Sequence, residues 1–389
     1  MGDFKRLDAL LKKFADETVP GCACVVMKKE EVLHEGYAGW ADAEQKRPID
    51  PKSVFRQAST TKLFTYAIMG MLYEEGRFLF SDPIGEYLPE WKHTTKWIRK
   101  ENGEVEVLPL ERPITVRDAA AMMCGLPYCM FPEPAPKDLT VKCMSEKMKE
   151  LLAKGTPTLR EEVRQMAEVP VRFEPGTHWL YGFGSEIIGA LVEELTGKSL
   201  RANFAERLIE PLGLKDTGTF LTDYLRKGLV RQYEKKEGRL FPVPEEEDMA
   251  LNATVTPEGA RPQLICSAKD FAIFMNMLAN GGVYDGKRYL AEGTVRLLAS
   301  DQLDERTARD FQNTYLAGYG YGLGFRVLKS QAQGFHNGHP GAFGWTGGTG
   351  IWAEADPVSG VSIVYMHNMR PNEELYHHHR IRNVVYADI

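Results

Sequence analysis

The sequence predicts a protein of the α/β class, with one antiparallel sheet built from both chain ends, flanked by helices, and a mostly helical segment inserted between. Strand-forming runs occur early, at 21–27 and 31–37, and again late, at 321–327, 350–355 and 361–366. The long middle of the chain instead shows helical patterns, with loops marked by Pro-Gly signals. The early and late strands can share one sheet if the two chain ends meet.

Each expected element has its own signal. The chain begins with an amphipathic helix, because four apolar residues share one of its faces: Leu7, Leu10, Leu11 and Phe14. The two early strands form a hairpin across a charged turn at Lys28-Lys29-Glu30. We expect residues 1–77 and 265–389 to form the sheet subdomain and residues 78–264 the helical subdomain. The active cleft would lie between them.

Length and composition limit the classes of function. The 389 residues exceed the usual size of one domain, so one large or two closely joined domains are expected. The 48 basic and 54 acidic residues give a net charge of −6, and the basic residues form no stripe. This balance does not favour nucleic acid or an acidic membrane surface as a partner.

Localisation and metal binding are predicted from absences in the sequence. The first residues lack the continuous apolar core of a signal peptide, and no apolar stretch reaches membrane-spanning length. We therefore expect a cytoplasmic protein. The six cysteines include no C-x-x-C pair, and the adjacent histidines His377, His378 and His379 cannot all face one ion. We expect no metal and no cofactor, and the sequence leaves the oligomeric state open.

The segment Ser59-Thr60-Thr61-Lys62 places a hydroxyl and an amine three residues apart, at the start of an apolar helix that ends near Gly76. Residues i and i+3 share a helix face, so the Lys62 amine can reach the Ser59 hydroxyl and produce an acylating serine. The alternative is that Ser59 only caps the helix and Lys62 is solvated. The apolar character of the helix favours the first interpretation, because a surface lysine normally lies on a polar stripe.

Two further segments can carry chemistry. Tyr181 follows a turn-rich loop that begins at Glu174-Pro175-Gly176 and lies just ahead of a helix. It is either a catalytic residue or a core residue whose hydroxyl binds the backbone. Residues 341–350 are rich in glycine and lead into a late strand. They form a tight turn or let a backbone N–H approach a ligand.

Taken in this order, the S-x-x-K segment, the tyrosine and the T-G-G segment at residues 346–348 resemble the serine β-lactamase and penicillin-binding-protein superfamily. The similarity is greatest to the class C β-lactamase branch, with its family VIII carboxylesterase and transacylase relatives. It extends over nearly the whole chain, because segments 112–118, 124–126, 210–217 and 267–282 are also similar to segments of that family. The resemblance implies a class C β-lactamase-like fold.

The resemblance also implies roles for individual residues. Ser59 would be the nucleophile, Lys62 its activating partner and Tyr181 the general base. The backbone N–H groups of Ser59 and Gly348 would form the oxyanion hole. The residues expected to contact substrate are Phe183, Trp345, Thr346 and Gly347.

Two departures from the β-lactamase pattern bear on substrate. Phe183 stands where the tyrosine motif of β-lactamases usually has Asn, and Trp345 stands where Lys or His usually precedes T-G. Neither side chain can replace an amide or pair with a carboxylate. In the family, esterases and acyltransferases often carry Trp at this place. The resemblance therefore implies a small-molecule ester or amide as substrate.

Several functions remain open from the sequence. The first is a carboxylesterase, or an acyltransferase, that uses an acyl-enzyme on Ser59 and small to medium neutral esters. The second is a β-lactamase or D,D-peptidase of the class C type. The third is a catalytically silent binding protein that keeps this fold.

Overall fold

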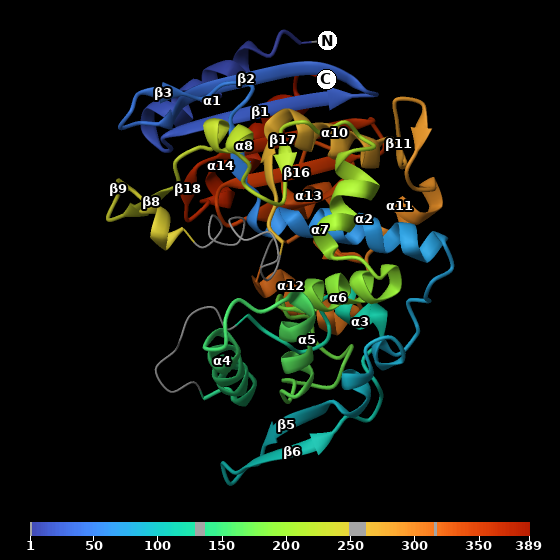
Figure 1. Ribbon diagram of the computed structural model, residues 1–389. Helices are drawn as coiled ribbons and strands as arrows, with labels where there is room; N and C mark the ends of the chain where they lie inside the picture. Colours follow the sequence, from blue (N-terminus) through green and yellow to red (C-terminus); the bar gives the residue numbers. More distant parts are fainter. Residues whose placement is uncertain (1, 129–136, 249–261, 315–316) are drawn as a thin grey trace.

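The computed structural model describes residues 2–128, 137–248, 262–314 and 317–389 (Figure 1). Its largest sheet has eight strands in the order β13-β14-β15-β16-β17-β1-β2-β3, and all neighbouring strands are antiparallel. The strands are β1 (Gly21–Lys28), β2 (Glu31–Asp42), β3 (Arg47–Pro48), β13 (Tyr319–Tyr321), β14 (Arg326–Leu328), β15 (Phe343–Gly347), β16 (Ile351–Asp356) and β17 (Val361–His367). The predicted α/β class with a sheet from both chain ends is confirmed.

The two chain ends meet at the pairing of β1 with β17. Their register runs from Cys22 opposite His367 to Lys28 opposite Val361. In Figure 1 the blue N-terminal strands and the red C-terminal strands accordingly lie side by side at the top of the molecule. Strand β15, which carries the glycine-rich segment, is thereby fixed in the same sheet as the start of the chain.

Both faces of β1 are buried, because successive side chains of a strand point to opposite faces. Cys22, Cys24 and Val26 pack with α1 (Lys5–Glu17) and α14 (Glu374–Tyr386) in a smaller core. The alternate residues Ala23, Val25 and Met27 belong to the main core, with α2 (Thr61–Glu74) and α10 (Ala268–Ala279). The sheet is therefore covered by helices on both sides.

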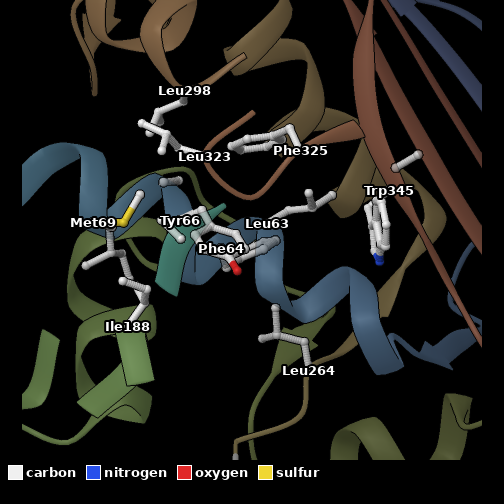
Figure 2. Packing of buried hydrophobic residues seen from close by; sticks show 14 of the residues in the cluster. Leu63, Phe64, Tyr66, Met69, Ile188, Leu264, Leu298, Leu323, Phe325 and Trp345 are labelled. Atoms are coloured by element: carbon white, nitrogen blue, oxygen red, sulfur yellow. The ribbon is translucent and has the colours of Figure 1, made fainter. Parts of the chain in front are cut away.

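Helix α2 runs through the main core and positions the S-x-x-K segment. Between Thr61 and Leu72, every residue except Lys62 is buried. The helix ends at Glu74, and Gly76 follows with a φ of +67°, as the sequence predicts. Figure 2 shows side chains of this helix among buried residues from other elements: Leu63, Phe64, Tyr66 and Met69 beside Ile188, Leu298 and Phe325.

The middle of the chain is mainly helical, but it also contains strands that the sequence analysis did not predict. Its helices are α3 (Val116–Ala120), α4 (Leu139–Leu152), α5 (Leu159–Ala167), α6 (Gly184–Thr196), α7 (Leu200–Phe204) and α8 (Asp223–Gly228). Two hairpins interrupt them: β5 (Thr95–Arg99) with β6 (Val105–Pro109), and β8 (Tyr233–Lys236) with β9 (Arg239–Pro242). The division into residues 1–77 with 265–389 and residues 78–264 stays a prediction.

Short elements complete the described chain. A second small sheet joins β4 (Val54–Arg56), β10 (Ile265–Ser267) and β7 (Thr217–Gly218), and β18 (Met369–Arg370) pairs with β8. The remaining elements are η1 (Ala58–Thr60), η2 (Ile84–Glu86), η3 (Pro89–His93), η4 (Ala205–Ile209), η5 (Glu245–Glu247), β11 (Val283–Tyr284), β12 (Lys287–Arg288), α11 (Glu292–Leu298), α12 (Glu305–Thr314) and α13 (Gln331–Gly334). Among the described residues, no helix has both the length and the apolar character needed to cross a bilayer.

The prediction of one continuous strand at 321–327 is wrong, because the structure has a turn there between β13 and β14. Gly324 has a φ of +99°, in the region that favours glycine. A Cβ atom at this position would lie 2.0 Å from Cδ2 of the Tyr66 ring. The glycine therefore lets the turn pack directly on helix α2.

Candidate active site

The candidate nucleophile lies on a tight turn between β4 and α2. Strand β4 ends at Arg56, and the 3-10 helix η1 (Ala58–Thr60) leads straight into α2. Ala58, directly before Ser59, has a φ of +45°, which is uncommon for a residue with a Cβ. The backbone N–H of Gln57 donates to the carbonyl of Leu264 over 2.9 Å, so the turn is anchored to the segment entering β10.

Ser59 and Lys62 come together as the sequence predicts. The Lys62 Nζ donates a hydrogen bond to the Ser59 Oγ over 3.3 Å, and both side chains are partly exposed. The spacing of three residues places both groups on one face of the first turn. A hydroxyl that can attack a substrate and an amine that can accept or give a proton are thus adjacent.

Tyr181 also reaches this place, from the loop ahead of α6. The centroid of its ring lies 5.4 Å from the Lys62 Nζ. Its phenol oxygen accepts a hydrogen bond of 3.1 Å from the Trp345 Nε1 on β15, and the two rings are 5.2 Å apart. The three motifs predicted from sequence therefore converge in space, at the junction of the sheet and the helical layer.

The glycine-rich segment approaches the nucleophile turn through its backbone. A Cβ atom on Gly347 would lie 2.6 Å from the carbonyl oxygen of Gln57, so strand β15 packs there without room for a side chain. Two residues later, the Thr349 Oγ1 donates to the Arg56 carbonyl over 2.6 Å. Gly348 lies between these two contacts and is exposed. The geometry therefore holds the turn that carries Gly348 against the turn that carries Ser59.

Asn372 is a residue of this region that sequence reasoning missed. Its side-chain amide donates to the Thr346 Oγ1 over 3.0 Å and to the Gly347 carbonyl over 3.1 Å. Thr346 in turn donates to the Ile351 carbonyl over 3.1 Å. Thr346 is only 7% exposed, and in this structure its hydroxyl holds the end of β15 in place. No local sequence pattern indicates Asn372, because its role depends on how the C-terminal segment folds back.

Phe183 was expected to contact substrate, but the structure buries its side chain. The side chain has no exposed surface and packs against the Tyr128 ring, with centroids 4.7 Å apart. Its backbone N–H donates to the Leu126 carbonyl over 3.0 Å, which turns the apolar side chain inward at the start of α6. Phe183 therefore supports the site from behind Tyr128. The position lacks the amide of β-lactamases, and its side chain is not exposed to a substrate.

Tyr128 is a second residue that sequence reasoning did not select. Its ring centroid lies 5.4 Å from the Lys62 Nζ and 5.6 Å from the Tyr181 ring. It lies two residues after Leu126, the last residue of the Cys124-Gly125-Leu126 segment that contributes to the family resemblance. That proximity in sequence is the signal that could have identified it.

Buried groups near the site are held in their neutral forms. Burial, and then the neighbouring Tyr128, raises the pKa of Tyr66 well above its ordinary value. Burial raises the pKa of the Cys124 thiol to about 12, and it also raises the pKa of Cys266 well above the usual value. These thiols are therefore not competing nucleophiles. In the part of the chain that the structure describes, no group of three or more His, Cys, Asp or Glu side chains could hold a metal ion.

A comparison with known protein families identifies the family of this chain. The model of the Beta-lactamase family matches residues 7–386. The chain therefore belongs to the Beta-lactamase family, within the serine β-lactamase and penicillin-binding-protein superfamily, and the predicted family is confirmed.

Individual relatives cover nearly the same length. The esterase EstB of Burkholderia gladioli is 26% identical over 379 residues, which are 93% of this chain and 90% of EstB. The solved structure of EstCE1, described as a hydrolase with promiscuous acyltransferase activity, has a TM-score of 0.80 at 22% identity and covers 98% of both chains. Simvastatin synthase (LovD) from Aspergillus terreus has a TM-score of 0.80 at 19% identity and covers 98% of this chain and 97% of LovD. The chain is thus similar to an esterase, to a hydrolase with promiscuous acyltransferase activity and to a synthase, and its fold is that of the β-lactamase-like proteins.

Proposed function

We propose that this protein is a serine hydrolase that acts through an acyl-enzyme on Ser59, with small to medium neutral carboxylic esters as substrates. The observation that carries the proposal is the convergence of Lys62 and Tyr181 at this serine. The Lys62 Nζ lies 3.3 Å from the Ser59 Oγ and 5.4 Å from the centroid of the Tyr181 ring. A nucleophile beside groups able to relay its proton is the arrangement that covalent catalysis requires.

In the proposed reaction, the Ser59 oxygen attacks the ester carbonyl while its proton passes to Tyr181, which acts as general base with Lys62 beside it. The carbonyl oxygen becomes an oxyanion, which accepts hydrogen bonds from the N–H groups of Ser59 and Gly348. The C–O bond to the alcohol then breaks, and the alcohol leaves with the proton. Water repeats the sequence on the acyl-enzyme, which releases the acid and restores Ser59.

The surroundings of Trp345 support a neutral substrate. Its N–H is directed to the Tyr181 oxygen, so this position offers no positive charge to a substrate carboxylate. The Arg326 guanidinium lies 5.7 Å from the indole ring, but it is 5% exposed and paired with Glu374. Its charge is therefore already compensated inside the protein.

The similarity to EstB, and to structures described as a promiscuous acyltransferase and a synthase, supports acyl transfer as part of the same activity. The acyl-enzyme would pass its acyl group to an alcohol wherever an alcohol takes the place of water. Hydrolysis and acyl transfer would share the first step, which is acylation of Ser59.

The test is a fluorophosphonate probe with intact-mass detection, combined with turnover of p-nitrophenyl butyrate. We expect one adduct, located on Ser59, and loss of both labelling and turnover in Ser59→Ala. An adduct on another residue would overturn the proposal. A chromogenic cephalosporin that reacts faster than the ester would identify a β-lactamase or D,D-peptidase instead, and inertness toward all three reagents would indicate a binding protein.

A further inference from the structure

Glu186, in the first turn of α6, is linked to the candidate site through Tyr128. Its two carboxylate oxygens accept the Tyr128 hydroxyl at 3.2 and 3.4 Å. One of them also accepts the Ser185 hydroxyl at 2.7 Å. The carboxylate therefore fixes the far end of a tyrosine whose ring lies against Lys62.

The Lys62 amine has two aromatic neighbours. Its Nζ lies 5.4 Å from the centroid of the Tyr128 ring and 5.4 Å from that of Tyr181, and these rings are inclined at 69° to each other. Both distances are within the range in which a ring face attracts a cation. The two rings therefore restrict where the amine can lie while it contacts Ser59.

A small cavity provides a second connection between Glu186 and Lys62. Its volume is about 30 Å³, which leaves space for a water molecule. Lys62 and Glu186 are the two ionisable side chains among the described residues that line it. The others are Ala58, Thr61, Thr65, Leu159, Ser185, Leu200, Pro262 and Gln263. A polar cavity of this kind allows a bridging water between the amine and the carboxylate.

We propose that Tyr128 and Glu186 are positioning residues for Lys62: the carboxylate orients the tyrosine, and the tyrosine ring holds the amine against Ser59. This inference rests on the proposed serine hydrolase function, because it assigns Lys62 a role in the chemistry. Among the described residues, the ionisable groups near the carboxylate include Lys62 and Tyr66 on α2, together with Tyr128 and Cys124. Burial raises the pKa of Tyr66 well above its ordinary value, so Tyr66 stays neutral in an assay near pH 7.

A purely structural role for Glu186 makes different predictions. An acidic residue in the first turn of a 13-residue helix interacts favourably with the helix dipole, and its loss would lower stability without changing the chemical step. The test must therefore separate rate from stability. Glu194→Gln is the matched control, because Glu194 lies on the same helix, half exposed, and pairs with Arg160 at 3.4 Å.

The experiment compares wild type, Glu186→Gln, Tyr128→Phe, the double variant and Glu194→Gln. We measure kcat and KM for p-nitrophenyl butyrate between pH 5 and 9, the rate of fluorophosphonate labelling, and thermal unfolding. We expect Glu186→Gln to lower kcat and the labelling rate about tenfold, typical of disturbed proton transfer, with KM nearly unchanged. Because a negative charge is removed, the pH–rate profile should move toward lower pH. The double variant should be no slower than the slower single variant, since both changes break one link.

Two outcomes would overturn the inference while leaving the proposed function intact. One is a wild-type rate and pH profile in Glu186→Gln, with loss of stability alone. The other is strictly additive losses in the double variant, which would mean that Glu186 does not act through Tyr128. A wild-type protein that neither hydrolyses the ester nor takes up the probe would overturn the proposed function itself, and this inference with it.

Discussion

The indole N–H of Trp345 donates a hydrogen bond to the phenol oxygen of Tyr181 over 3.1 Å. This contact joins the glycine-rich strand to the loop before α6 and gives the tyrosine oxygen a neutral donor. A hydrogen bond to a negatively charged oxygen is stronger than one between neutral groups, so this donor favours the phenolate form that a tyrosine base must have before it takes the serine proton. The indole can therefore assist a tyrosine base without bringing a positive charge into the substrate site.

Replacing Trp345 by Phe tests this assistance, because Phe keeps an aromatic ring and removes the N–H. Loss of a hydrogen bond to a charged group costs about 1.5–3 kcal/mol, so kcat for p-nitrophenyl butyrate should fall roughly 10- to 100-fold. KM should change much less, since the donor is directed at Tyr181. An unchanged kcat in the folded variant would show that the hydrogen bond does not contribute to the reaction.

Replacing Trp345 by Lys tests the basis of substrate choice. The Trp345 side chain is only 2% exposed, so a lysine here would have to extend its ammonium out of this buried position to pair with a substrate carboxylate, which the indole cannot do. We expect the ratio of chromogenic cephalosporin turnover to ester turnover to rise about tenfold, equivalent to about 1.4 kcal/mol. A ratio equal to that of the wild type would contradict the assignment of substrate charge preference to this residue.

The two neighbouring glycines predict different effects of an added methyl group on stability. At Gly347 a Cβ atom would lie 2.6 Å from the Gln57 carbonyl, whereas at Gly348 it would meet no atom of the described residues within 4 Å. Gly347→Ala should therefore lower the free energy of unfolding by about 1–3 kcal/mol through overpacking. Gly348→Ala should unfold like the wild type. Urea denaturation of the two variants gives the comparison, and equal stabilities would contradict the close backbone approach.

The histidines of the C-terminal region predict a loss of stability in acid. Burial lowers the pKa of His367 and of His378 well below 6.5. The pKa of His379 is lowered to about 4, mainly by burial and also by the positive charge of the nearby Arg382. Below pH 6.5 the unfolded chain takes up protons that the folded protein does not bind. The free energy of unfolding should therefore decrease as pH falls from 6.5 to 4, with a slope of about 1.4 kcal/mol per pH unit for each proton.

His378→Phe checks this prediction. Neither ring nitrogen of His378 has a hydrogen-bond partner among the described residues. The His378 ring stacks on the Trp352 ring, with the two centroids 5.6 Å apart. Phe keeps the ring and cannot take up a proton, so the dependence of stability on pH should become shallower. Stability at pH 8 should be nearly unchanged. Urea unfolding at pH 5 and pH 8 measures both effects, and a slope as steep as that of the wild type would contradict the prediction.

The sequence predicted those elements whose signals lie in a few adjacent residues. The hairpin of β1 and β2, the start of α2 beside Ser59 and the turn at Gly76 all follow from adjacent residues. The middle of the chain was less predictable. The hairpin of β5 and β6 is short, so its alternation of Val105 and Val107 with glutamates was lost among helical signals.

In the candidate site, too, some positions follow from adjacent residues and others only from tertiary packing. Ser59 and Lys62 lie three residues apart, and the structure places them within 3.3 Å. The positions of Tyr128, Phe183 and Asn372 depend on tertiary packing, which single-sequence patterns do not encode. Phe183 illustrates the difference: its residue type indicated that the amide of β-lactamases is missing, but only the packing on Tyr128 shows that its side chain faces the core.

The pairing of β1 with β17 has a consequence for when the candidate site is assembled during synthesis. Ser59 leaves the ribosome early, whereas strand β15 and the turn with Gly348 follow only after most of the chain has been made. Contacts between such distant segments form late and slowly. A nascent chain thus carries Ser59 before it has the strand that brings Gly348 to it, and the candidate site is assembled only when translation is nearly finished.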